Sequence, residues 1–89
     1  MKIVLSKHII EKKIPLLRSL GWNITKSKIK KIIQNPKWKG FTEANQPTIM
    51  GLVDKMHILR VVYRQNNGII FVITIHIARR GRYESTKNK

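Results

Sequence analysis

A histidine and several arginines lie together near the end of this sequence, and these residue types can bind and cleave a phosphodiester. His76 stands near the end of the apolar segment "IIFVITIHIA", and Arg79, Arg80 and Arg82 follow it. Histidine can accept or donate a proton near neutral pH. Arginine can bind phosphate oxygens through its planar fork and stabilise the added negative charge of a pentacoordinate phosphorus. If the 2′-hydroxyl of RNA is the nucleophile, this chemistry requires no metal ion.

The net charge of the chain points to a polyanionic partner. Nineteen lysines and arginines stand against four acidic residues, which gives a formal charge of +15 at pH 7. Nucleic acid is the polyanion that such a charge favours most. The lysines are scattered along the chain and carry little positional information. The arginines carry more, because five of the six lie in the last third of the sequence: Arg60, Arg64, Arg79, Arg80 and Arg82.

Length and composition exclude several classes of protein. At 89 residues the chain predicts one domain, 1–89, with a frayed tail at 84–89. It has no cysteine, and its histidines (His8, His57 and His76) lack the spacing of metal ligands, so we expect no metal and no other cofactor. No apolar run reaches the roughly 18 residues of a membrane helix. The apolar stretch at the start is too short for a signal peptide, so we expect a cytoplasmic protein with no membrane partner.

The first part of the chain predicts a strand over 2–5 and a helix from about residue 7 toward residue 20. Ser6 has the residue type and position of an N-cap, and Gly21 those of a C-cap. Pro15 removes a backbone donor, so we expect a kink or a break there. The buried stripe of this helix is expected to contain Ile10, Ile14 and Leu17.

A second helix and four further strands follow. Thr25 is the predicted N-cap of the second helix, which ends at Asn35-Pro36 because a residue before proline avoids the helical region. Its buried stripe is Ile29, Ile32 and Ile33, and the lysines on its other face (Lys26, Lys28, Lys30 and Lys31) are interpreted as solvated. The predicted strands cover 37–41, 48–54, 57–64 and 69–78.

The loop between the last two strands decides which side chains share a face of the sheet. A two-residue turn at 67–68 would place Arg60 on the apolar face beside Ile75. A three-residue loop at 66–68 keeps this charge off the apolar face. Because burying an unpaired charge is costly, the sequence predicts the three-residue loop. The apolar face then contains Leu59, Val61, Tyr63, Ile69, Phe71, Ile73, Ile75 and Ile77, and the polar face contains Arg60, Arg64, Thr74 and His76.

The predicted register assembles a candidate catalytic site on an uncovered face of the sheet. Arg60 lies opposite Thr74, and His76 is a diagonal neighbour within reach of a long side chain. Arg60 and His76 are the first catalytic candidates. His8 is the second histidine candidate, because the start of a helix favours the neutral imidazole that a general base requires. His57 is interpreted as structural. Candidates for binding nucleic acid are Arg64, Thr74, Arg79, Arg80, Arg82 and Tyr83.

Several motifs occur in an order that resembles a known family. A strand precedes "SKH", which opens a helix, and "NITKSKIKKIIQNP" and "RVVYRQNNGIIFVITIHIARRGRY" follow. The sequence resembles small uncharacterised domains related to the RelE/ParE toxin superfamily, with BrnT-type toxins as nearer relatives. His8 matches the histidine that opens their first helix, and Asn35-Pro36 matches the end of their second. Residues 59–63 and 72–80 match a strand pair that ends in paired arginines.

The resemblance implies an α+β fold with one or two N-terminal helices packed on a twisted antiparallel sheet. It also implies a metal-independent endoribonuclease toxin that acts on RNA, free or on the ribosome, and that an antitoxin protein neutralises. The stretch between His8 and Thr25 departs from the family, being longer than usual and containing Pro15. Two alternatives remain open: a non-catalytic module that binds nucleic acid, and a ParE-like inhibitor that binds a protein target.

Overall fold

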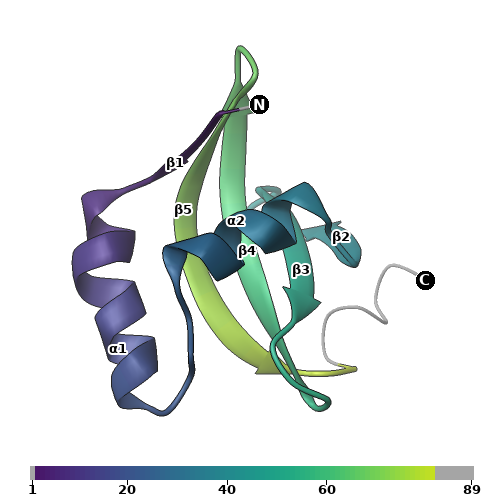
Figure 1. The fold of residues 1–89 in the computed structure, drawn as a ribbon. Coiled ribbons are helices and arrows are strands. Elements are labelled where there is room, and N and C mark those ends of the chain that lie inside the picture. Colours follow the sequence, from purple (N-terminus) through teal and green to yellow (C-terminus); the bar gives the residue numbers. More distant parts are fainter. Residues whose placement is uncertain (1, 82–89) are drawn as a thin grey trace.

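The computed structural model describes residues 2–81 (Figure 1). The fold is α+β, as the sequence predicts. The candidates Arg82 and Tyr83 and the expected tail at 84–89 lie outside the described residues. The elements are β1 (Lys2–Leu5), a π-helical segment η1 (Ile9–Lys13), α1 (Ile14–Ser19), α2 (Lys26–Gln34), β2 (Trp38–Phe41), β3 (Pro47–Leu52), β4 (His57–Asn66) and β5 (Ile69–Arg79).

The five strands form one mixed sheet in the order β1-β5-β4-β3-β2. Strands β2 to β5 pair as antiparallel neighbours along the chain. Strand β1 pairs in parallel with β5, from Lys2 opposite Ile69 to Leu5 opposite Val72. The expectation of a wholly antiparallel sheet is therefore wrong at this edge. Parallel neighbours require a long crossover, and the two helices between β1 and β2 provide part of that connection.

Pro15 changes the first helix without breaking it. Ser6 caps the helix, because its Oγ accepts a hydrogen bond from the Ile9 amide at 3.3 Å. The Ile14 amide donates to the Ile9 carbonyl, five residues back, so the turn before the proline is wider than an α-helical turn. A π-turn of this kind adapts a helix to an irregular residue and rotates the faces that follow. Ile9 is consequently buried in place of the expected Ile10, which is 37% exposed.

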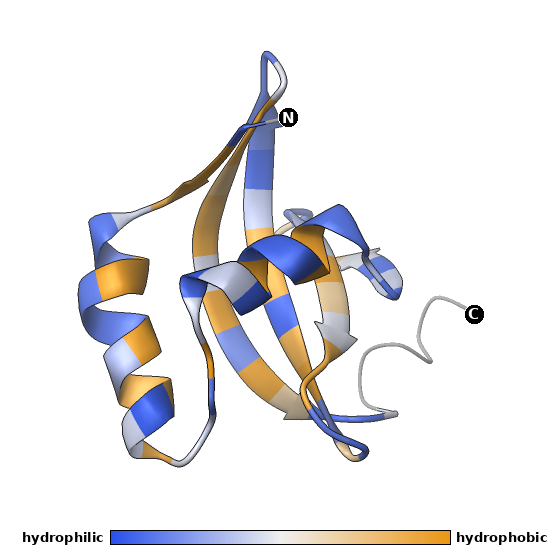
Figure 2. Ribbon diagram, viewed as in Figure 1, coloured by the Kyte–Doolittle hydropathy of each residue, from blue (hydrophilic) through white to orange (hydrophobic). Residues whose placement is uncertain are grey.

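One apolar cluster joins both helices to a single face of the sheet, which we call the helix face. Thr25 caps α2 by accepting the Lys28 amide at 3.1 Å, and Gly21 ends the preceding helix with a φ of 96°. Figure 2 shows how apolar and hydrophilic residues alternate along the strands that the helices cover. The buried residues of this cluster are Ile9, Ile14, Leu17, Ile24, Ile29, Ile32, Ile33, Ile49, Leu59, Val61, Ile70, Val72 and Ile75.

The turn between β4 and β5 contains two residues, so the expected three-residue loop is wrong. Asn67 and Gly68 have φ values of 51° and 77°, and Asn66 pairs directly with Ile69. Positive φ at both central residues is the geometry for which Asn-Gly is favoured in hairpins. The two-residue turn at 67–68, which the charge argument set aside, is therefore the turn that the structure contains.

A bulge in the same hairpin shifts the register, so that the residues beyond it lie on the faces that the sequence predicts. The register shifts between Val62 and Tyr63, where Ile73 is the extra residue of β5. Beyond the bulge Arg60 pairs with His76 and Val61 pairs with Ile75, so Arg60 and Ile75 lie on opposite faces.

Between the bulge and the turn, the expected faces of β5 are reversed. Phe71 pairs with Arg64 and Ile69 pairs with Asn66, whereas Val72 belongs to the cluster under the helices. The placement of Phe71 and Ile69 on the apolar face is thus wrong. An extra residue switches the alternation of a strand, and nothing in the residue types of this segment marks its position.

Candidate nucleic-acid interface

A second apolar cluster occupies the sheet face opposite the helices, which we call the strand face. Within residues 2–81 this cluster contains strand residues alone: Met50, Ile58 and Ala78 are buried, and Trp38 packs against them. The pairing register adds other side chains to the strand face: Thr48, Arg60, Val62, Thr74 and His76. The candidate residues from the end of β5 therefore adjoin a partly apolar surface.

Arg60 lies on the strand face but is largely buried, with 9% of its surface exposed. Its Nη2 donates to the Phe41 carbonyl oxygen at 3.4 Å, so its side chain reaches across β3 from β4 to β2. Within the described residues the strand face carries no helix, but Arg60 is not open to solvent on it, as the predicted site requires. Its side chain is held inside the molecule and connects strands, which leaves little of the guanidinium accessible to a substrate.

His76 lies directly opposite Arg60, where the sequence predicts Thr74, so it is a direct and not a diagonal neighbour of Arg60. Thr74 lies opposite Val62, and both His76 and Thr74 are partly exposed. Four of the predicted site residues on these two strands therefore share one face: Arg60, Arg64, Thr74 and His76. Of these, the histidine combines accessibility with the ability to transfer a proton.

Two cations lie near the ring of Trp38 on the edge strand β2. The Arg80 guanidinium carbon lies 5.8 Å from the centroid of the Trp38 ring, and the Lys37 Nζ lies 5.9 Å from it. The Arg80 amide donates to the Met56 carbonyl oxygen at 2.8 Å, which fixes the chain just beyond β5. Sequence reasoning missed Trp38 and Lys37, although a tryptophan between lysines is a signal of nucleic-acid binding.

A second pairing of cation and aromatic ring lies near the β4–β5 turn. The Arg64 guanidinium carbon stands 4.8 Å from the centroid of the Phe71 ring, and Arg64 is exposed. The reversed alternation of β5 produces this contact, because it turns Phe71 toward the face of Arg64. Arg79, also exposed, ends β5 opposite His57. Cations thus mark both ends of the long hairpin.

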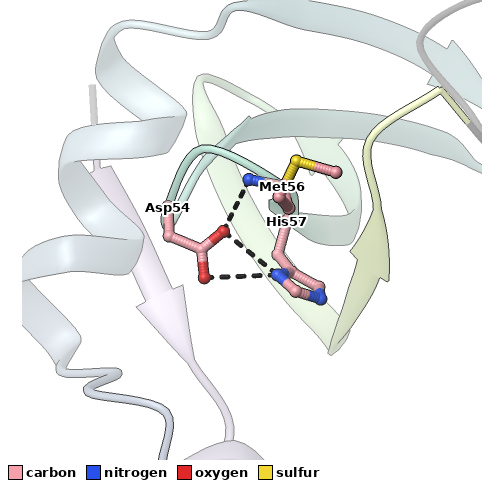
Figure 3. A network of polar contacts seen from close by, with 3 residues as sticks. All are labelled: Asp54, Met56 and His57. Atoms are coloured by element: carbon pink, nitrogen blue, oxygen red, sulfur yellow. Dashed lines mark hydrogen bonds and ion pairs between the residues drawn. The ribbon is translucent and has the colours of Figure 1, made fainter.

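His57 belongs to a polar network in the turn between β3 and β4 (Figure 3). Its Nδ1 lies 3.0 and 3.2 Å from the two carboxylate oxygens of Asp54, and the Met56 amide donates to one of these oxygens at 2.8 Å. The hydrogen bond from Met56, with a further contribution from His57, lowers the pKa of Asp54. The His57 ring also meets the Trp22 ring edge-on, with 4.8 Å between centroids. These contacts agree with the structural interpretation of His57.

His8 is not brought together with the other candidates. It is exposed at the start of the first helix, which packs on the helix face, whereas Arg60 and His76 lie on the strand face. Within the described residues, no group of three or more histidines and acidic side chains could hold a metal ion. No helix between residues 2 and 81 is long and apolar enough to cross a membrane.

The arrangement of the strand face can bind phosphate and aromatic bases, and it offers one accessible histidine for proton transfer. Comparisons with protein-family models, with curated proteins and with solved structures find no match to this chain.

Proposed function

We propose that this protein binds RNA at the end of its strand face. The observation that carries the proposal is that two cations, Arg80 and Lys37, lie 5.8 and 5.9 Å from the centroid of the Trp38 ring. Proteins that bind single-stranded nucleic acid combine a positive surface for the phosphates with aromatic rings for the bases. The exposed Arg79 lies at the same end of the sheet. A net charge of +15 adds the long-range attraction that such binding requires.

Trp38 provides the sharpest test of this proposal. The chain has two tryptophans, so a Trp22→Phe variant leaves Trp38 as its sole indole. Stacking of a base on Trp38 should quench its fluorescence as a labelled single-stranded RNA of mixed sequence is added. Trp38→Ala should weaken binding of the same RNA by about 5- to 150-fold, because a stacked base contributes about 1–3 kcal/mol.

A matched control separates this site from the general charge of the protein. Lys30 is exposed on α2, away from the strand face, and Lys30→Gln should leave RNA affinity unchanged. Unchanged Trp38 fluorescence at saturation, together with full affinity in Trp38→Ala, would mean that RNA docks elsewhere. An absence of RNA binding in the wild-type protein would refute the proposal itself.

The cross-strand pair of His76 and Arg60 favours a second candidate function, the cleavage of RNA. His76 would accept the proton of a 2′-hydroxyl, whose oxygen forms a bond to the adjacent phosphorus. The bond from phosphorus to the 5′-oxygen breaks, and that oxygen takes a proton from water. The products are a 2′,3′-cyclic phosphate and a 5′-hydroxyl. Arg60, being largely buried, would position His76. The resemblance to RelE/ParE toxins supports this candidate and adds an antitoxin partner to it.

Cleavage and binding respond differently to the loss of His76. His76→Ala should reduce the single-turnover cleavage rate by about 10²–10⁴-fold while RNA affinity stays nearly intact. His8→Ala is the matched control and should cleave at the wild-type rate, because His8 lies in the other layer of the fold. Cleavage by His76→Ala at the wild-type rate would remove the histidine as the proton acceptor. No cleavage by the wild type, with or without ribosomes, would leave RNA binding alone.

A further inference from the structure

The contact with Asp54 determines how the His57 ring carries its protons. An ionised carboxylate can only accept hydrogen bonds, so the Nδ1 atom that lies 3.0 Å from it must be a donor. The neutral ring therefore holds its proton on Nδ1 and gains the second proton on Nε2. Figure 3 shows Nε2 on the side of the ring away from Asp54. The His57 side chain is 31% exposed, so solvent or a ligand can reach it.

A further contact holds the His57 ring, and a hydrogen bond fixes the His57 backbone. Trp22, from the connection between the helices, meets it edge-on at 4.8 Å between centroids. The His57 carbonyl accepts the Val53 amide at 3.0 Å and thereby closes the turn between β3 and β4. A ring that is fixed in orientation loses little conformational freedom when it binds a ligand. The Nε2 atom of His57 can consequently contact a ligand at little cost in conformational entropy.

His57 lies on the helix face, at the same end of the sheet where Arg80 lies beside Trp38 on the strand face. Its cross-strand partner is the exposed Arg79. The carbonyl of the preceding residue, Met56, accepts the amide of Arg80. Asp54 contacts Nδ1 of the ring and Arg79 is the cross-strand partner of His57, whereas Trp22 brings no charge. An anion that binds Arg79 would come close to the ring and would interact more favourably with its charged form than with its neutral form.

We propose that His57 is a proton-dependent phosphate ligand: protonated on Nε2, it contacts an RNA phosphate beside Arg79. This inference rests on the proposed RNA binding and adds pH control to it. Because binding and protonation are linked reciprocally, RNA binding takes up a proton, and RNA affinity rises as the pH falls from about 8 to about 6. One exposed charge pair contributes at most about 1 kcal/mol, so the expected increase in affinity is about two- to fivefold.

The test compares RNA affinity at about pH 6 and about pH 8 at constant ionic strength. The probe is a labelled single-stranded RNA of mixed sequence. His57→Gln should bind at about pH 8 like the wild type but lose most of the increase at about pH 6. His8→Gln should keep the full increase, since it removes an exposed histidine from the other layer. Calorimetry in two buffers of different ionisation enthalpy should record proton uptake by the wild type and less by His57→Gln.

A measurement on the wild-type protein keeps the inference testable if His57→Gln folds poorly. The NMR signal of the His57 ring, followed against pH, should change at a higher pH when RNA is present. An equal pH effect in wild type and His57→Gln would overturn the inference, as would a His57 titration that RNA leaves unchanged. Wild-type protein that binds no RNA at either pH would refute the proposed function instead, so the two failures are distinguishable.

Discussion

Asp54, the only aspartate of the sequence, is a residue whose charge contributes to the stability of the fold. Its pKa lies below the ordinary value of 3.8, chiefly because its carboxylate accepts the Met56 amide and also because it contacts His57. A carboxyl group with a lowered pKa in the folded state favours folding at every pH above its unfolded value. That contribution disappears as the pH falls through the pKa of the folded state.

We therefore expect Asp54→Asn to lower the free energy of unfolding near neutral pH and to lower it less in acid. The asparagine oxygen can still accept the Met56 amide, so the variant isolates the charge. The difference between wild type and variant should shrink as the pH falls below about 4. Urea unfolding of both proteins across this range measures it. A difference that stays constant down to about pH 2 would show that the charge of Asp54 has no part in stability.

Arg60 shows what residue type and position can and cannot reveal. The cost of burying an unpaired charge correctly predicts that Arg60 and Ile75 lie on opposite faces of the sheet. It does not predict that Arg60 is largely buried on its own face, where its guanidinium reaches the Phe41 carbonyl two strands away. That contact depends on strands separated by 19 positions in the sequence, and no local pattern encodes it.

The strands of the β4–β5 hairpin can be predicted from the sequence, but their pairing cannot. Alternation predicts the two strands, and the structure has both, but the predicted three-residue loop is a two-residue Asn-Gly turn. The register between them could not be predicted, because the bulge at Ile73 shifts the pairing halfway along the strands. A two-residue turn and a three-residue loop exclude each other only if the pairing register stays constant along both strands. Because of the bulge, the hairpin has the two-residue turn and still places Arg60 on the face that the three-residue loop predicts.

Contact between α2 and β3 requires a glycine at position 51. A Cβ placed on Gly51 would lie 2.8 Å from Cγ1 and 3.0 Å from Cγ2 of the buried Ile32. Gly51→Ala should therefore destabilise the protein by about 1–3 kcal/mol, the usual cost of overfilling a packed core. Denaturant unfolding provides the measurement.

Gly40→Ala on β2 is the matched control for this prediction. Its Cβ would meet only ordinary contacts, 3.4 Å from Thr48 Oγ1 and 3.7 Å from Met50 Cε. We expect no loss of stability, since alanine also restricts the unfolded chain more than glycine does. Equal stability of Gly51→Ala and wild type would show that α2 can move away from the sheet at little cost.

At the scale of the whole molecule, the sequence predicts the class of fold and most of the core. It does not predict which edge of the sheet β1 joins, because four residues of a strand fit either edge equally well. The same limit applies to the candidate site. Residue types identify Arg79, Arg80 and His76, but only the folded chain brings Trp38 to Arg80 and separates His8 from His76.

The central claim is that two cations at this end of the sheet, Arg80 beside Trp38 on the strand face and Arg79 on the helix face, hold RNA phosphates beyond what net charge alone provides. Lysines on the outer side of α2 offer the same charge without the geometry, since Lys26 and Lys30 are exposed in the other layer. Two double variants, Arg79→Ala/Arg80→Ala and Lys26→Ala/Lys30→Ala, therefore change the net charge equally. Circular dichroism should first confirm that both variants fold like the wild type.

The most direct measurement is the salt dependence of RNA affinity in these two variants. Each phosphate contact with a single strand contributes about 0.7 to the slope of log affinity against log salt. The arginine variant should lose about one to one and a half units of slope. The lysine variant should keep the wild-type slope. Equal losses in the two variants would contradict the account, because RNA would then respond to the charge of the protein and not to this surface.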